Sequence, residues 1–291
     1  MPRIDEGYRQ EVTSKLVAAL KNGTAPWQKP WTDRYMPVNA ITGRHYSGIN
    51  SIFLSIEGER LSENCDPRWI TAKQAGKKGW LIKSGAKPVI ISCIFFPEAH
   101  QDDVEINGLG CPIRRMYALF HASQIKGIPA FAVRERGTVI DNRMIDKIIF
   151  NSSARVYEGG FEACYMPSDD VIRMPNKNYF SSTEGYYSTL LHELVHWTGH
   201  RSRLDRITLS SNNFEAYARE ELVAEIASIF LTAELGITQT QEHFEQHAAY
   251  VNYWIRLLES DPNAIFAAAK EARKAANYIL MFKEVEIKLA S

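Results

Sequence analysis

The feature that most constrains the fold of this 291-residue chain is an apolar helical stretch with two histidines four residues apart. The stretch SSTEGYYSTLLHELVHWTG spans residues 181–199 and opens with a capping-box pattern that makes Ser181 the expected N-cap. His192 and His196 fall on one face of this helix, about one turn apart. Leucine, valine and tryptophan surround them, so histidines without a compensating partner would be costly to bury. The spacing predicts that both imidazoles bind one metal ion.

Glu193 follows the first histidine, which gives the order H-E-x-x-H found in zinc metallopeptidases. A glutamate beside such a metal can accept a proton from water and return it to a leaving group. We therefore predict Zn²⁺ as the cofactor, bound by His192 and His196, with Glu193 as the catalytic base. Mn²⁺ or Co²⁺ could occupy the same ligands.

A third protein ligand is expected, because catalytic zinc sites commonly use three. Residues 218–231, AREELVAEIASIFL, predict a second apolar helix that offers Glu221 and, one turn later, Glu225. In an arrangement that resembles that of the gluzincins, Glu221 is the ligand and Glu225 orients a ligating histidine from the second shell. Glu225 and His200 remain open as alternative ligands, although His200 would need a sharp turn of the chain to reach the same ion. Glu220 is expected on another face of the helix, as a solvated charge.

The charge balance divides the chain near residue 150. Residues 1–150 carry 21 Lys and Arg against 15 Asp and Glu, whereas residues 151–291 carry 13 against 19. A basic half and an acidic half suggest different partners. We predict an α+β protein of two domains, with a mixed α/β domain over 1–150 and a mainly helical domain with a small antiparallel sheet over 151–291.

Hydrophobic spacing supports this division. Residues 5–22, the stretch after Gly48 and residues 69–79 are predicted to be helical. KPVIISCIFFP and RRMYALFHASQI are typical of strands. After residue 150 the segment EACYMPSDDVIRMP is expected to form strands, and helices are expected to follow.

Composition predicts a cytoplasmic protein without a membrane partner. No stretch approaches the roughly 18 unbroken apolar residues of a membrane helix. The opening MPRIDEGYRQ has no apolar h-region. The four cysteines are scattered and form no C-x-x-C pair, which favours reduced thiols.

The basic half contains a stretch suited to nucleic acid. No acidic residue occurs between Pro67 and Pro97, while lysines recur there and tryptophans are interleaved. Lysines neutralise phosphates and exposed aromatic rings stack on unpaired bases, so the pattern predicts single-stranded DNA binding without sequence preference. A merely solvated lysine face with packed tryptophans is the competing explanation. The candidate DNA contacts, including those on a glycine-flanked turn at 43–48, are Arg44, Tyr46, Lys73, Lys77, Lys78, Trp80, Lys83 and Lys87.

Together these motifs resemble those of the ArdC-type antirestriction proteins, a plasmid-encoded family related to the N-terminal part of conjugative-plasmid primases. The resemblance implies an N-terminal domain that binds single-stranded DNA and a C-terminal zincin metallopeptidase-like domain. It also implies protection of DNA that enters by conjugation from host type I restriction. His192, Glu193 and His196 match the zincin motif one for one, and Glu221 matches less closely. The resemblance rests on APWQKPW, PVNAITGRHYSGIN, WITAKQAGKKGWLIKSGAKP, YALFHASQIKG, YMPSDDVIRMP, STLLHELVHWTGHRSRLDR, YAREELVAEIAS and AAAKEARKAANYIL.

Three functions remain open on these grounds. The chain is a DNA-binding shield with a structural or interaction-type metal domain, or a DNA-dependent peptidase that acts on DNA-bound proteins such as host restriction-enzyme subunits, or a general cytosolic zinc peptidase. The glutamate of H-E-x-x-H argues against a purely structural metal, which needs no base and usually has four protein ligands. The favoured expectation is single-strand binding together with a zinc site, with proteolysis as a hypothesis.

Overall fold

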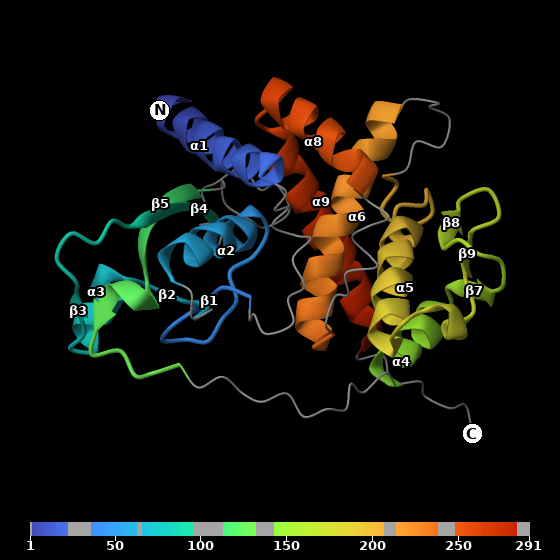
Figure 1. The fold of residues 1–291 in the computed structure, drawn as a ribbon, viewed down its shortest axis with the longest axis horizontal. Helices are drawn as coiled ribbons and strands as arrows, with labels where there is room; N and C mark the ends of the chain where they lie inside the picture. Colours follow the sequence, from blue (N-terminus) through green and yellow to red (C-terminus); the bar gives the residue numbers. More distant parts are fainter. Residues whose placement is uncertain are drawn as a thin grey trace, which may run out of the picture. The chain divides into compact units, whose positions relative to one another are not determined.

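The computed structural model describes residues 2–22, 36–62, 66–95, 113–131, 143–206, 214–237 and 248–283 (Figure 1). The chain divides into two compact units, one formed by Arg34–Ala132 and the other by Met1–Asp33 together with Val133–Ser291. Helices and small sheets are both present, which confirms the predicted α+β class. Within the described ranges, no helix is long and apolar enough to cross a membrane.

Residues 34–132 form the smaller unit, which is built around a four-stranded sheet. Its strand order is β1-β2-β5-β4; β1 runs parallel to β2, and the other neighbours are antiparallel. A two-stranded sheet, β3 with β6, lies beside the short helix α3, and α2 packs against β4. The bounds are β1 Val38–Asn39, α2 Ile49–Leu61, β2 Arg68–Thr71, α3 Ala72–Lys77, β3 Leu81–Ile82, β4 Val89–Phe95, β5 Ile113–His121, η1 Ala122–Gln124 and β6 Ile125–Lys126.

The strands predicted from KPVIISCIFFP and RRMYALFHASQI are β4 and β5, and they pair with each other. The helix predicted over 69–79 is shorter than expected, because residues 68–71 belong to strand β2. Thr71 ends that strand and caps α3, since its side chain accepts from the Gln74 backbone N–H while the Gln74 side chain bonds back to the Thr71 backbone. Local capping chemistry thus sets where the helix can begin.

The larger unit consists of helices packed beside a three-stranded sheet of order β7-β9-β8. The predicted antiparallel sheet is in fact mixed, because β7 runs parallel to β9 and only β8 is antiparallel to it. The strand β7 carries little apolar periodicity and was not expected. The bounds are α1 Pro2–Lys21, α4 Arg143–Ser152, β7 Arg155–Glu158, β8 Cys164–Met166, β9 Val171–Met174, η2 Lys177–Tyr179, α5 Thr183–Thr198, α6 Phe214–Leu235, α8 Ala248–Ser260, α9 Ala264–Leu280 and η3 Met281–Lys283.

Helix α6 lies at the centre of this unit and packs against α5, α8 and α9 (Figure 1). Small side chains make the contact with α9 possible, because alanines let two helix backbones approach closely. The buried alanines of α9 are Ala264, Ala268, Ala269, Ala272, Ala275 and Ala276.

Helices α1 and α4 belong to this unit, so the division differs from the predicted boundary at residue 150. On α1, the Thr13 hydroxyl donates to the Pro262 carbonyl at 2.9 Å, and Lys21 pairs with Glu259 at 2.6 Å. On α4, the Asn151 side chain donates to the Phe282 carbonyl at 2.7 Å. The boundary was predicted from charge balance, which cannot reveal the core on which an amphipathic helix packs.

Candidate metal centre

Helix α5 presents the two histidines of the motif to a buried space beside α6. Its N-cap is Ser182, one residue after the predicted cap, and the Ser182 side chain accepts from the Gly185 backbone N–H at 3.0 Å. The helix ends at Gly199. From Gly185 to Thr198 every residue of α5 is buried, so the helix is held on all sides and its side chains have fixed directions.

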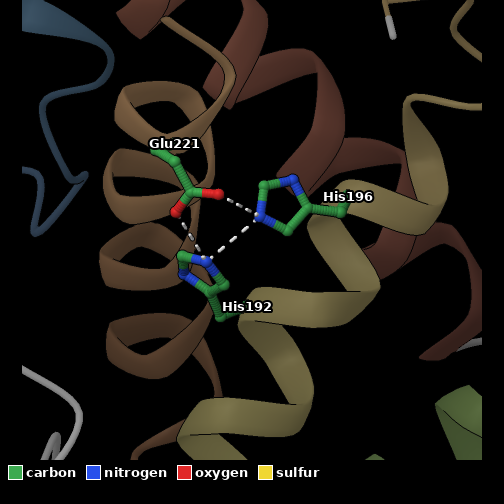
Figure 2. Close-up of side chains that lie close together, drawn as sticks. All are labelled: His192, His196 and Glu221. Atoms are coloured by element: carbon green, nitrogen blue, oxygen red, sulfur yellow. Dashed lines mark hydrogen bonds and ion pairs between the residues drawn. The ribbon is translucent and has the colours of Figure 1, made fainter. Parts of the chain in front are cut away.

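His192, His196 and Glu221 converge on one point between α5 and α6 (Figure 2). The two Nε2 atoms lie 3.1 Å apart. The Glu221 carboxylate oxygens lie 3.5 Å from Nε2 of His192 and 3.3 Å from Nε2 of His196. All three residues are buried. Among the described residues, these three form the group that could hold a metal ion.

The donor set fits a small divalent cation. Two atoms bound to a tetrahedral metal at about 2.0–2.1 Å are about 3.3–3.4 Å apart, and the three measured separations bracket that value. Two imidazole nitrogens and one carboxylate oxygen also leave a coordination position open. Of the three candidates, Glu221 is the one that the structure brings together with the two histidines, and its role as third ligand stays a prediction.

Each histidine has a further carboxylate behind it, on its Nδ1 side. Glu225, predicted in the second shell, lies 3.9 Å from Nδ1 of His192. Glu220 lies 3.4 Å from Nδ1 of His196, so the expectation of a solvated charge was wrong. Its side chain is 14% exposed and pairs with Arg206. A carboxylate that accepts a hydrogen bond from Nδ1 fixes the tautomer that directs Nε2 at a metal. The 3.4 Å contact of Glu220 is within hydrogen-bond distance, whereas the 3.9 Å contact of Glu225 is an ion-pair distance.

The carboxylates surrounding His196 change its protonation. Burial favours the neutral imidazole, but the charge of Glu221 and the hydrogen bonds to Glu220 and Glu221 hold the pKa of His196 well above its ordinary value. Burial likewise raises the pKa of Glu220, but its hydrogen bonds with His196 and Arg206 outweigh this and lower it. These contacts favour the protonated imidazole, and a proton on it would compete with a metal ion for the ring nitrogen.

Glu193, the predicted base, is buried on the same helix as the two histidines. It is 8% exposed, and its charge contributes to the raised pKa of His196. Burial and the charge of Glu193 also raise the pKa of Cys164, which lies on β8. Because β8 is an edge strand that contacts α5, the carboxylate lies near a strand edge that an extended peptide could pair with.

Two further residues have contacts that the sequence could not define. His200 lies beyond the end of α5 and its Nδ1 lies 2.8 Å from the Ser202 hydroxyl. Tyr217, one turn before Glu221 on α6, is 52% exposed and hydrogen-bonds with Glu221 and Tyr250. Burial and the charge of Glu221 raise the pKa of Tyr217. The i, i+3, i+4 spacing of polar residues on α6 was the available signal.

The predicted DNA contacts all lie in the smaller unit. Arg44 is exposed on the turn that follows β1, and Tyr46 is half-buried there. The Asn39 side chain donates to the Tyr46 hydroxyl and to Gln74 on α3, both at 3.3 Å. The turn and α3 are therefore neighbours. The lysines of this group are exposed, namely Lys73, Lys77, Lys78, Lys83 and Lys87.

Trp80 and Lys83 are engaged within the protein. Trp80 is half-buried and packs against a small core of Ile70, Ala75 and Ile125, which is the packing role considered as its alternative. The ammonium of Lys83 donates to the Ser123 carbonyl at 2.6 Å. The tryptophans of the APWQKPW connector lie outside the described residues.

Family models match both parts of the chain. Residues 6–120 match the N-terminal domain of anti-restriction factor ArdC, and residues 143–271 match a zincin-like metallopeptidase. Two DNA primases named TraC from Escherichia coli are 39% and 38% identical over 99% and 96% of this chain. The chain spans 28% and 20% of their lengths. The protein y4eC of Sinorhizobium fredii is 27% identical, over 96% of this chain and 93% of y4eC.

Solved structures agree with this match over nearly the full length. The crystal structures of antirestriction protein ArdC from plasmid R388, Mn(II)-bound and metal-free, have TM-scores of 0.78 and 0.77 at 35% identity. The alignments cover 95% and 94% of this chain and 98% and 97% of ArdC. Together with the converging ligands, the Mn(II)-bound relative implies a divalent metal in the centre described above. The chain belongs to the ArdC antirestriction family.

Proposed function

We propose that this chain is an antirestriction protein that binds single-stranded DNA and protects DNA entering by conjugation from host type I restriction. The observation that carries the proposal is the pairing, in one chain of the ArdC family, of an exposed basic surface on residues 34–132 with a buried metal centre. The proposed DNA surface combines α3 with the adjoining turn.

Charge and exposure support this surface. Lys73, Lys77 and Lys78 are exposed on or just after α3, and Arg44 is exposed on the turn that Asn39 ties to that helix. No acid lies between Pro67 and Pro97 to neutralise them. Such a surface attracts a polyanion whatever its base sequence, and the affinity should fall steeply with salt.

The direct test is binding of fluorescent single-stranded and duplex DNA to the full chain across a salt series. The full chain is needed because a fragment 1–150 would separate α1 and α4 from the unit on which they pack. Tighter binding to single strands, weakening steeply with salt, supports the proposal. Equal weak binding to both forms would make the lysines a solvated face.

We propose Zn²⁺ as the metal held by His192, His196 and Glu221. It would supply a Lewis acid with an open coordination position. Glu225 and Glu220 would keep the two imidazoles oriented, and Glu193 would accept a proton from water and return it to a leaving group. Metal content of the protein purified without added metal, measured by mass spectrometry, would decide between Zn²⁺, Mn²⁺ and Co²⁺.

A second candidate function is proteolysis of proteins bound to DNA, with host restriction-enzyme subunits as substrates. The observation that favours it is that Glu193 is buried and its charge acts on both His196 and Cys164 of the edge strand β8. A purely structural metal would need neither a base nor a nearby strand edge. If the chain is instead a general cytosolic peptidase, the basic surface has no role in its function.

These functions can be distinguished by measuring how efficiently an unmodified plasmid is transferred into a host that restricts it. Cells would carry the wild-type chain, Glu193→Ala, or Glu184→Ala as a matched change near the start of the same helix. Loss of protection by Glu193→Ala alone, with zinc and DNA affinity retained, supports proteolysis. Protection by Glu193→Ala at the wild-type level would leave DNA binding as the whole function.

A further inference from the structure

Two arginines lie in the segment that follows α5 and turns back against its last turn. The side chains of Arg203 and Arg206 are only 9% and 6% exposed. Arg203 donates from Nε to the Trp197 carbonyl at 2.6 Å, and Arg206 donates from Nη2 to the Val195 carbonyl at 2.9 Å. Both therefore satisfy carbonyls at the helix C-terminus, where a positive charge also complements the helix dipole.

The two arginines differ in their remaining partners. Arg203 turns to the sheet, where it pairs with Asp170, donates to the Tyr165 hydroxyl at 3.2 Å and stacks over the Trp197 ring at 4.0 Å. Arg206 turns to α6. It binds Glu220 through two nitrogens, at 2.8 and 3.2 Å, and also donates to the Thr198 hydroxyl at 2.9 Å. The two-point contact holds the carboxylate in one orientation.

Glu220 continues this chain of contacts to a predicted metal ligand. Its Oε1 faces Nδ1 of His196 at 3.4 Å, while Nε2 of the same ring faces Glu221 at 3.3 Å. A proton on Nδ1 that is shared with Glu220 leaves the Nε2 lone pair directed at the metal position. Arg206 is thus two contacts from the metal, through Glu220 and the ring.

We propose that Arg206 is a positioning residue of the metal centre, which holds Glu220 against Nδ1 of His196 and so keeps the imidazole in its metal-binding orientation. This inference rests on the proposed metal site and adds to it a residue that binds neither metal nor substrate. Without the guanidinium, Glu220 would keep one partner and lose the two-point contact that fixes its plane. Removing an outer partner of a metal ligand weakens metal binding about 10–100-fold.

Arg203 provides a matched control, because it caps the same helix end from a similarly buried position but contacts no predicted ligand or its outer carboxylate. Arg206→Met and Arg203→Met would be made in the full chain. Zn²⁺ affinity would be measured by competition with a chromogenic chelator, and the melting temperature with and without Zn²⁺. If Arg206 has only a structural role, Arg206→Met lowers the melting temperature by the same amount with and without Zn²⁺. If Arg206 positions the metal site, the variant also shows a smaller rise in melting temperature when Zn²⁺ is added.

We expect both variants to melt earlier without metal, and only Arg206→Met to bind Zn²⁺ about 10–100-fold more weakly. Arg206→Lys should bind Zn²⁺ more tightly than Arg206→Met, because lysine keeps the positive charge but cannot make the two-nitrogen contact of arginine. Equal effects of the two arginine changes on Zn²⁺ affinity, or none from Arg206→Met, would overturn the inference. Failure of the wild-type chain to bind Zn²⁺ would instead overturn the metal site itself, and the inference with it.

A second variant answers the question if Arg206→Met does not fold. Glu220→Gln leaves Arg206 bonded to Val195 and Thr198, so the helix end stays capped. We expect Zn²⁺ affinity to fall at least tenfold, because an uncharged amide holds the imidazole proton less strongly. Wild-type Zn²⁺ affinity in Glu220→Gln would show that the Arg206–Glu220 pair serves only the fold.

Discussion

The two units of this chain use charge in opposite ways. In the larger unit, opposite charges are buried within about 3–4 Å of each other around one point, so each position depends on its neighbours. In the smaller unit, like charges are spread over an exposed surface, which we propose binds DNA. A metal centre therefore depends on the positions of a few individual atoms. A surface that binds a polyanion depends instead on how many positive charges it carries per unit area.

The largest expected effect is that of His192→Ala on Zn²⁺. Loss of a ligand should weaken affinity by more than the 10–100-fold expected for an outer partner. Chelator competition measures it, with His200→Ala as the control, because His200 bonds with Ser202 rather than with the three ligands. Loss of Zn²⁺ from His200→Ala would show that the ligand set is wrong. DNA affinity should be unchanged in both variants.

Next in size is the dependence of metal binding on pH. The pKa of His196 is raised in the metal-free protein, so a metal must displace its proton. Below that pKa the Zn²⁺ affinity should rise with pH, by about tenfold per pH unit for each proton released. Calorimetry in buffers of different ionisation enthalpy counts the protons. DNA affinity, which would rest mainly on lysines and an arginine, should change far less with pH than Zn²⁺ affinity. If Zn²⁺ affinity and DNA affinity responded to pH in the same way, the proposed difference between the two units would be wrong.

A moderate effect is expected from replacing Lys73, Lys77 and Lys78 together by glutamine. Three lost phosphate contacts should make the slope of log affinity against log salt shallower by about 2 for a single strand. Fluorescence anisotropy across a salt series measures the slope. The same replacement of three exposed lysines in the larger unit, Lys147, Lys270 and Lys274, is the control, and Zn²⁺ affinity should not change. An unchanged slope would place the DNA elsewhere.

The smallest effect on DNA is expected from Trp80→Leu. Because Trp80 packs against Ile70 and Ala75, the change should lower the free energy of unfolding by about 1–2 kcal/mol, as measured by urea denaturation. DNA affinity should change little. The opposite result, unchanged stability with about 1–3 kcal/mol of binding lost, would make Trp80 a stacking platform after all.

The sequence predicts features that depend on local spacing, and it does not predict those that depend on contacts between distant segments. That His192 and His196 point to one place could be predicted, because helix geometry puts residues four apart on one face. Their convergence with Glu221 required only a second apolar helix beside the first. The buried position of Glu220 could not be predicted, because its partners His196 and Arg206 come from separate segments that only the packing of the chain brings together. Burial of Trp80 and the attachment of α1 to the larger unit are likewise decided by contacts distant in sequence.

The arrangement of helix α6 has a mechanical consequence. Glu220, Glu221 and Glu225 reach the centre from this one helix, and both histidines come from α5. A small rotation of α6 about its axis would carry all three carboxylates together past rings that stay in place. Helix α6 packs against α9, whose buried residues include six alanines. We therefore expect metal affinity to depend on the spacing between helices, so that replacing one buried alanine of α9 by a larger residue would weaken metal binding although it changes no ligand.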